Sequence, residues 1–183
     1  MITIIPTTEI DQGSEEWLQL RNQYITGTDA ILLLKGKSIE QILSAKQNTK
    51  PWAGNYWTQR GHEMEKEAKI IYSEVFSPVK DAGFIINDKF PYCGVSPDGL
   101  VGEDGLVEVK AFNEARHFAV YEDIEPSIIA QTQYQLFVSE RDWVDLILFN
   151  PDVKNAKDAM LIKRLTPDKK IQKQFNTIFK KQT

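Results

Sequence analysis

Three residues whose types and spacing could do chemistry stand close together in the middle of the chain. Asp98 lies in Ser96-Pro97-Asp98-Gly99-Leu100, and Glu108 and Lys110 follow in Val107-Glu108-Val109-Lys110. Alternate side chains of an extended strand share a face, so Glu108 and Lys110 should point one way and the two valines the other, into apolar packing. If Asp98 lies beside Glu108, their carboxylates form a hard-oxygen site that suits Mg²⁺, with Mn²⁺ able to substitute.

Such a site would perform phosphodiester hydrolysis. A metal ion there polarises the phosphoryl oxygen and lowers the pKa of a bound water, while Lys110 orients or deprotonates the nucleophile and offsets negative charge in the transition state. The alternative is that Asp98-Gly99 is only a hairpin turn and that Glu108 and Lys110 are an exposed pair on an edge strand. The spacing of these residues alone does not decide between the two.

The elements that must position these residues follow from the hydrophobic pattern. Short apolar runs separated by turn residues predict strands over residues 83–86, 92–95, 106–110, 143–149 and 159–165. Cap residues and helical spacing predict helices that begin after Ser14, Thr26 and Ser38, at Pro126 and after Thr166. This alternation predicts an α/β fold with a central mixed sheet flanked by helices.

The longest helical pattern covers residues 56–76 and should cross the core. Its apolar stripe consists of Trp57, Gly61, Met64, Ala68, Tyr72 and Val75. On such a helix Glu63 points away from the stripe, whereas Glu65 and Glu67 flank it, and either could enter a cleft. The alternative for both is an ordinary carboxylate at the boundary of the core.

Composition limits the protein class. The chain of 183 residues is 42% hydrophobic and 26% charged, which excludes wholesale disorder and fits one domain over residues 1–183. We expect an N-terminal helical part over 1–55, a catalytic core over 56–150, and a C-terminal strand and basic helix over 151–183. The net charge of −4 argues against a basic protein that coats nucleic acid.

The charge is nevertheless segregated along the chain. Residues 150–183 hold eight lysines and Arg164 against three aspartates. The closing lysines could contact backbone phosphate or form solvated helix turns, and the sequence leaves both open; they are Lys169, Lys170, Lys173, Lys180 and Lys181.

Cysteine content and the N-terminus bear on location. The single Cys93 rules out an internal disulfide and fits a reducing compartment. The first residues lack the basic flank and long apolar run of a signal peptide, and no stretch approaches about 18 apolar residues. We therefore expect a soluble cytoplasmic protein.

The sequence resembles lambda exonuclease and the YqaJ-like viral recombinase nucleases, a family of the PD-(D/E)XK superfamily. The resemblance runs from about Glu16 to Phe149. Its elements, in order, are Trp17 and Arg21 leading into Ile25-Thr26-Gly27-Thr28, then Gly61-x-x-x-Glu65, Ser96-Pro97-Asp98-Gly99-Leu100, Glu108-Val109-Lys110, Arg116, and Ala130-Gln131-Thr132-Gln133-Tyr134. The resemblance implies a restriction-endonuclease-like core.

The resemblance also implies roles for these residues. Asp98 and Glu108 would ligate Mg²⁺ with the Val109 carbonyl, and Lys110 would activate the water. Glu65 matches the acidic residue of the core-crossing helix, acting on metal or water, and Gln131 matches a glutamine near the scissile phosphate.

A second set matches residues that hold a terminal 5′-phosphate, namely Arg21, Thr28 and Arg116. An arginine fork binds phosphate bidentately, and a hydroxyl at a helix start adds to free backbone N–H groups. Thr28 keeps the hydroxyl where lambda exonuclease has serine, and it adds a methyl group.

The implied function is a Mg²⁺-dependent 5′-to-3′ exonuclease on linear double-stranded DNA. It would release mononucleotides and leave 3′ single strands for phage-type recombination in the cytoplasm of a bacterial host. The resemblance further implies a trimeric ring and a single-strand annealing protein as partner. The alternatives are a structure-selective endonuclease or nickase of the same fold, and a DNA-binding assembly module without catalysis.

The remaining histidine and aromatic side chains have less specific interpretations. His62 and His117 have no metal-ligand spacing, and we expect them to line or flank the site without a catalytic role. Trp52 and Tyr56 could stack on a splayed base, whereas Trp57 is better explained as core.

Overall fold

The computed structural model describes residues 1–48 and 56–181, with side chains in the second segment described from Gln59 onward. The helices are α1 (Glu15–Asn22), α2 (Ala30–Leu34), α3 (Ile39–Gln47), α4 (Tyr56–Val75), α5 (Glu114–Glu122), α6 (Pro126–Ser139) and α7 (Lys169–Lys180), with 3₁₀ turns η1 (Gly27–Asp29) and η2 (Ala156–Asp158). Within these residues the structure shows no helix long and apolar enough to cross a membrane.

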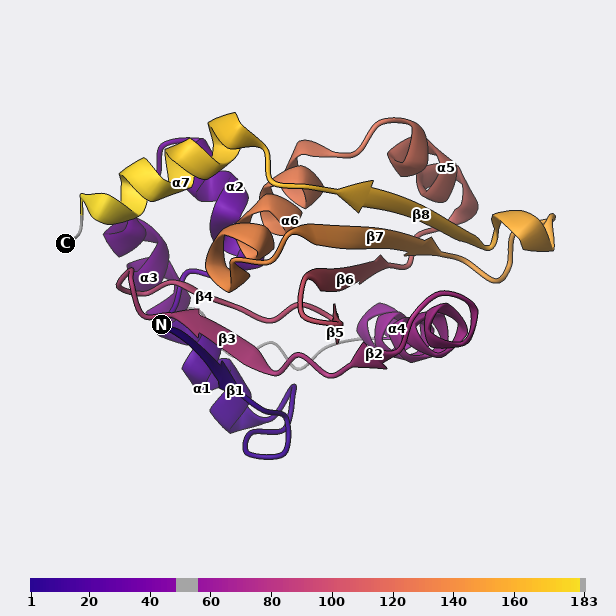
Figure 1. The fold of residues 1–183 in the computed structure, drawn as a ribbon, viewed down its shortest axis with the longest axis horizontal. Helices are drawn as coiled ribbons and strands as arrows, with labels where there is room; N and C mark the ends of the chain where they lie inside the picture. The colour runs from indigo at the N-terminus through magenta and orange to yellow at the C-terminus, as the bar shows by residue number, and fades with distance from the viewer. Residues whose placement is uncertain (49–55, 182–183) are drawn as a thin grey trace.

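A five-stranded mixed sheet forms the centre of the molecule (Figure 1). Its strands, in spatial order, are β2 (Val79–Lys80), β5 (Gly99–Val101), β6 (Gly105–Lys110), β7 (Trp143–Phe149) and β8 (Met160–Leu165). The central pair β6 and β7 is parallel, and every other pair is antiparallel. A parallel pair needs a crossover, which α5 and α6 supply between these two strands. The predicted α/β fold with a mixed central sheet is confirmed.

Helices cover both faces of this sheet. On one face, Ala68 and Tyr72 of α4 pack against a cluster that includes Val107 and Val109 of β6. On the other face, α5 and α6 pack against β7, as in the contact cluster that contains Ile128. Val107 and Val109 therefore face α4 as predicted, and the alternate residues of β6 face α6.

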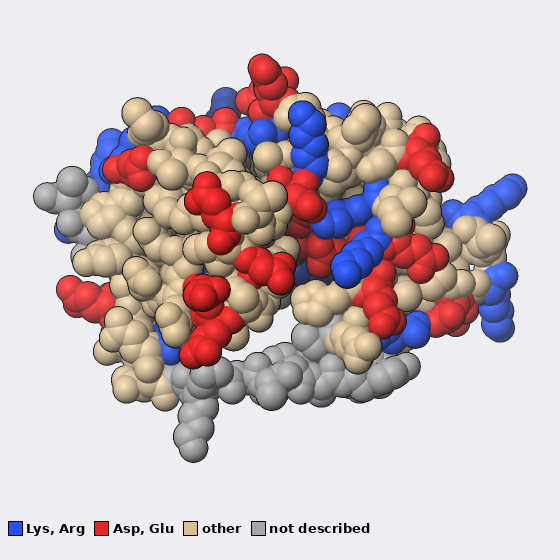
Figure 2. Space-filling model, turned by 90° about the horizontal axis from the view of Figure 1, so that it is seen from below, with Lys and Arg blue, Asp and Glu red and all other residues tan. Residues whose placement is uncertain are grey.

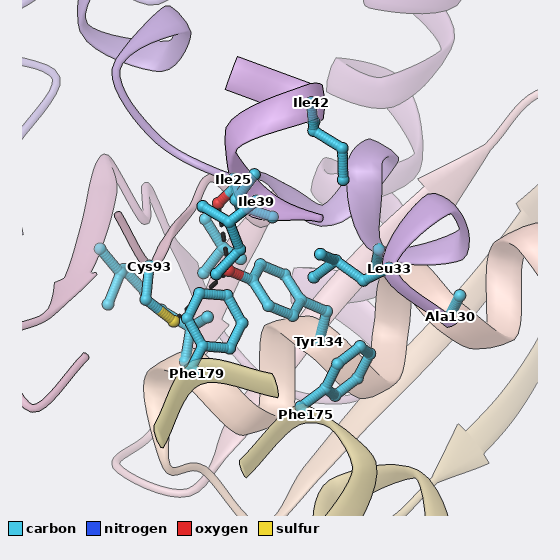
Figure 3. Packing of buried hydrophobic residues seen from close by; sticks show 13 residues of the cluster. Ile25, Leu33, Ile39, Ile42, Cys93, Ala130, Tyr134, Phe175 and Phe179 are labelled. Atoms are coloured by element: carbon cyan, nitrogen blue, oxygen red, sulfur yellow. Dashed lines mark hydrogen bonds between the residues drawn. The ribbon is translucent and has the colours of Figure 1, made fainter. Parts of the chain in front are cut away.

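A second sheet packs with the N-terminal helices. Strand β1 (Ile2–Ile5) pairs with β3 (Phe84–Asn87), which pairs with β4 (Gly94–Val95), all antiparallel. Tyr134 of α6 lies at the centre of the core between this sheet and helices α2, α3 and α7 (Figure 3). Its hydroxyl donates to the Ile25 carbonyl oxygen at 3.2 Å and contacts Cys93 Sγ at 3.4 Å. The aromatic rings of Phe175 and Phe179 pack around it.

Several helix starts form where the cap residues predict them. The Ser14 side chain accepts from the Trp17 N–H, and Ser38 and Gln41 form the reciprocal bonds of a capping box. Helix α6 starts at Pro126, where the missing N–H costs nothing.

Other predictions need correction. Val75 was expected on the inward stripe of α4, but it is 65% exposed. The predicted strand over 92–95 is shorter, because Tyr92 adopts the left-handed region with φ 60°. Strand β1 and helix α5 were not predicted. The division of the chain into parts at residues 55 and 150 stays a prediction.

Candidate active site

The candidate site lies beside β6, at the point where β5 stops pairing with it. Strand β5 pairs with β6 only up to the partners Gly99 and Val107, so the following three residues of β6 have no strand on this side. Asp98 occupies that position: its N–H donates to the Val107 carbonyl oxygen at 3.1 Å, and its Oδ2 accepts from the Val109 N–H at 2.7 Å. Because the N–H and C=O of one strand residue point to the same edge, the Val109 carbonyl is directed into this opening.

Glu108 is the centre of a buried hydrogen-bond network. It is 3% exposed, and its Oε1 accepts from Lys110 Nζ and from Gln131 Nε2, both at 2.7 Å. Lys110 Nζ also donates to Gln131 Oε1 at 2.9 Å. These contacts show that Glu108 and Lys110 share a face as predicted, and that they are no exposed pair on an edge strand.

Gln135, which the sequence analysis missed, completes this network. Its Nε2 donates to Glu108 Oε2 at 2.7 Å, so each oxygen of the carboxylate is held by a glutamine of α6. The side chain is buried, and its Oε1 has no hydrogen-bond partner among the described residues. The signal that could have found it is the i, i+4 spacing from Gln131, which places both amides on one helix face.

Glu65 reaches the opening from the opposite side, on α4. Lys69, one turn later, joins it to the site: Lys69 Nζ lies 3.1 Å from Glu65 Oε1 and donates to the Asp98 carbonyl oxygen at 2.9 Å. The Glu65 side chain is 18% exposed, whereas Glu63 and Glu67 are exposed. The structure therefore selects Glu65 from the two candidates that the helical spacing allowed.

Burial and the neighbouring carboxylates change the pKa of Asp98. Burial raises the pKa of Asp98 well above its usual range, and the charges of Glu108 and Glu65 raise it further. Burial alone would lower the pKa of Lys110, but the charge and hydrogen bond of Glu108 outweigh burial, so the net shift is upward. The site thus holds three carboxyl groups beside two ammonium groups, those of Lys69 and Lys110.

Arg21 lies near these carboxylates, on α1. Burial lowers its pKa, while the charges of Asp29, Glu108 and Asp98 oppose that shift. None of the described residues forms a hydrogen bond or ion pair with the Arg21 guanidinium. A partly buried guanidinium in this state is suited to an anionic ligand.

The turn that carries Thr28 is fastened to the site. Asp29 Oδ2 accepts from the N–H and hydroxyl of Thr26 at 2.8 and 2.9 Å and from Lys46 Nζ at 2.6 Å. A Cβ at Gly27 would lie 3.0 Å from Cγ of Gln131, so the turn packs directly on α6. Thr28 itself is exposed, and its hydroxyl contacts that of Thr26 at 3.3 Å.

Arg116 lies on α5, and its charge opposes the upward shift in the pKa of Lys110. Its guanidinium forms two 2.8 Å hydrogen bonds with Glu125 and stacks 3.9 Å over the ring of Phe112. It borders a cavity of about 640 Å³ that Arg21 and Thr28 do not line. This cavity therefore does not bring Arg116 together with Arg21 and Thr28, and the phosphate role of the three residues stays a prediction.

Comparison with known proteins places this geometry in a family. The model of the YqaJ-like viral recombinase domain matches residues 16–142, which contain almost every residue described above. The chain belongs to this family. No curated protein matches the sequence.

Two solved structures share the fold of this YqaJ-like chain. The complex of LHK-Exo with dAMP matches with a TM-score of 0.79 at 25% identity, covering 91% of this chain and 89% of that one. The structure of LHK-Exo, an alkaline exonuclease from Laribacter hongkongensis, matches with a TM-score of 0.76 at 24% identity, covering 92% of each chain.

The YqaJ-like site fits a magnesium ion by the chemistry of its donors. Burial, and then the charges of Glu108 and Glu65, raise the pKa of Asp98, and a divalent cation would favour its charged form. Among the described residues, no group of three or more histidine, cysteine, aspartate or glutamate side chains is arranged to hold a metal by itself. Mg²⁺ needs only one or two carboxylates, because water and substrate phosphate complete its shell.

The two histidines considered in the sequence analysis occupy different environments. His62 lines a cavity with Glu65, so its flanking position is confirmed. The same expectation for His117 is wrong, because His117 is fully buried and bonds through Nε2 to the Asp158 carbonyl oxygen at 2.8 Å. Trp52 and the side chains of Tyr56 and Trp57 lie outside the described residues.

Basic side chains do not merge into one continuous surface on the face shown in Figure 2, where they lie among acidic ones. The lysines of α7 are exposed, which is compatible with either role considered for them. The predicted catalytic, metal and phosphate roles stay predictions, while the structure brings together Glu65, Asp98, Glu108, Lys110 and Gln131.

Proposed function

We propose that this YqaJ-like protein is a metal-dependent nuclease that hydrolyses phosphodiester bonds of DNA. The observation that carries the proposal is the set of carboxylates around the open edge of β6, with Lys110 and Gln131 bonded to Glu108; they are Glu65 on α4, Asp98 just before β5, and Glu108 on β6. A binding module has no need to hold carboxylates together against repulsion. The alkaline exonuclease LHK-Exo, with its similar fold, supports the same conclusion.

Each residue then has a role that its position supports. Asp98, Glu108 and the Val109 carbonyl would hold Mg²⁺, or Mn²⁺ in its place, which polarises the phosphoryl oxygen and acidifies a water when bound. Lys110 orients the attacking water through Nζ and offsets negative charge on the phosphate. Gln131 holds the side chains of Lys110 and Glu108 in position through its hydrogen bonds to both. Glu65 accepts a hydrogen bond from the water or contributes to the metal site.

The finer proposal is a 5′-to-3′ exonuclease on linear duplex DNA. Arg21 and Thr28 would hold the terminal 5′-phosphate, with Arg116 at the far side of the site. Every hydrolysis that releases a mononucleotide creates a new 5′-phosphate, so such an enzyme can advance by repeating one binding event. The remaining 3′ single strand would serve recombination with an annealing protein, with the nuclease working as a trimeric ring in the bacterial cytoplasm.

One observation keeps an endonuclease or nickase as the second candidate. Arg116 borders a cavity that Arg21 and Thr28 do not line, so Arg116 can contact DNA at a place apart from the other two residues. An enzyme that contacts phosphates at two separate places can also bind an internal segment of a strand.

The experiment compares three substrates in Mg²⁺: linear duplex with 5′-phosphate, linear duplex with 5′-hydroxyl, and closed circular duplex. The exonuclease proposal expects fast release of mononucleotides from the phosphorylated duplex, slower release from the hydroxyl form and none from the circle. Equal cutting of the circle would establish the endonuclease alternative. No cutting of any substrate would overturn the nuclease proposal.

A further inference from the structure

A cavity beside the proposed catalytic centre has only one lining residue, Arg116, with a role assigned so far. It has a volume of about 640 Å³ and lies between α4 and the loops that follow β6 and β7. Its lining includes Ala111, the neighbour of Lys110, and Met64, the neighbour of Glu65. The carboxyl ends of parallel strands are where α/β sheets commonly bind ligands.

Gly61 forms part of the cavity wall, in the interior of α4. Glycine is unfavourable within a helix because it exposes backbone and loses more conformational freedom than alanine. At Gly27 the protein itself explains the glycine, since a Cβ would press on Gln131. At Gly61 a Cβ would meet no heavy atom within 4 Å, so internal packing does not require glycine there. A bare helix surface at this point leaves room for a ligand to approach the backbone.

The other walls carry groups that suit a nucleotide. Arg60 and Arg116 border the cavity, and each is paired with a carboxylate, Asp152 and Glu125 respectively. Both pairs are solvent-accessible and therefore contribute little stability, so an incoming phosphate can replace the carboxylates at small cost. Phe112, under the Arg116 guanidinium, adds an aromatic surface.

We propose that this cavity holds the nucleotide unit next to the scissile phosphate, with Gly61 as the point where the sugar–phosphate backbone approaches α4 and Arg60 as a further phosphate contact. The inference rests on the proposed nuclease function and names the part of the substrate that this side of the site takes. Filling the cavity from Gly61 should therefore obstruct DNA while leaving the fold intact.

The experiment uses the full chain as wild type, Gly61→Ala, Gly61→Leu and Gln59→Leu. Gln59 is an exposed, neutral residue of the same helix that lines no part of the cavity, so Gln59→Leu controls for the introduced side chain. Three quantities are measured: the melting temperature, the Kd for a fluorescent 5′-phosphorylated duplex in Ca²⁺, and the rate of its degradation in Mg²⁺.

The proposal expects opposite changes in stability and DNA binding. Gly61→Ala should melt at or above the wild-type temperature, because alanine favours the helix, yet bind the duplex several-fold more weakly. Gly61→Leu should lose at least tenfold in both Kd and rate, and Gln59→Leu should match wild type. Wild-type affinity in both folded Gly61 variants would overturn the inference. If the wild type binds duplex without cutting it, the nuclease function fails, while the Kd comparison still tests the cavity.

Discussion

Gln135 Nε2 and Glu108 Oε2 lie 2.7 Å apart, and this contact fixes the orientation of both side chains. A carboxylate only accepts hydrogen bonds, so the amide of Gln135 must present its nitrogen to Glu108. Its oxygen is thereby left buried without a partner among the described residues. An unpaired buried acceptor costs about 1–3 kcal/mol, a cost that makes sense if the orientation of Glu108 matters for function.

Gln135→Met should lower the apparent affinity of the proposed site for Mg²⁺. The substitution keeps the volume of the side chain but leaves Glu108 Oε2 without its donor. Residues that orient a metal ligand typically contribute about 10–100-fold in metal affinity. We expect the Mg²⁺ concentration for half-maximal DNA degradation to rise by about tenfold or more, with activity partly restored at high Mg²⁺. A metal titration of the initial rate measures this.

Gln133→Met is the matched control. Gln133 is also buried on α6, but its amide bonds to the Thr166 carbonyl oxygen and the Asp168 N–H, away from Glu108. This variant should lose stability in urea while its Mg²⁺ titration stays at the wild-type midpoint. Equal midpoints in both variants would remove the orienting role of Gln135.

Glu108→Gln should abolish hydrolysis and retain the fold. An amide is a poor ligand for a divalent cation, and losing about 4 kcal/mol of transition-state stabilisation corresponds to about 10³-fold in rate. The measurement is nucleotide release in Mg²⁺, with circular dichroism confirming the fold. Glu103→Gln, an exposed substitution in the preceding turn, should behave as wild type. Full activity of Glu108→Gln would rule out its assignment as a metal ligand.

Arg116→Ala should reduce the preference for phosphorylated ends more than the maximum rate. Its pair with Glu125 is exposed, so we expect a loss of stability within about 1 kcal/mol. The ratio of rates on 5′-phosphate and 5′-hydroxyl duplexes measures the effect. Lys89→Ala, which removes a cation from another exposed pair, should leave that ratio unchanged. An unchanged ratio in Arg116→Ala would contradict the phosphate role.

The Cys93 thiol should resist alkylation in the folded protein. It is fully buried, and burial raises its pKa to about 12, so at pH 8 the reactive thiolate is scarce and inaccessible. Its contribution to stability should be complete below pH about 9 and fall as the pH rises toward the folded pKa. Iodoacetamide labelling followed by mass spectrometry should give no adduct in buffer and one in urea. Rapid labelling in buffer would contradict this burial.

Much of the site could be predicted because its residues carry strong local signals. Alternation along β6 placed Glu108 and Lys110 on one face, and helical spacing limited the α4 carboxylate to two residues. Choosing Glu65 required Lys69, whose contact with the Asp98 carbonyl oxygen joins segments 29 residues apart in the chain. No local pattern contains that information.

Long-range context also explains the features that were missed. Strand β1 has only four residues and depends on β3 as its partner, about 80 residues later. Gln135 has only the signal of its i, i+4 spacing from Gln131, and its role arises because α6 lies against β6. Val75 continues the apolar stripe of α4, yet it is exposed.

Helix α6 connects the hydrophobic core to the hydrogen-bond network around Glu108. It presents Tyr134 to the hydrophobic core and Gln131 and Gln135 to Glu108. Releasing the glutamines by local opening would require withdrawing Tyr134 from the centre of that core. Backbone amides of α6 should therefore exchange with solvent deuterium only through global unfolding. The catalytic network and the native state should then be lost together on heating, with no folded but inactive intermediate.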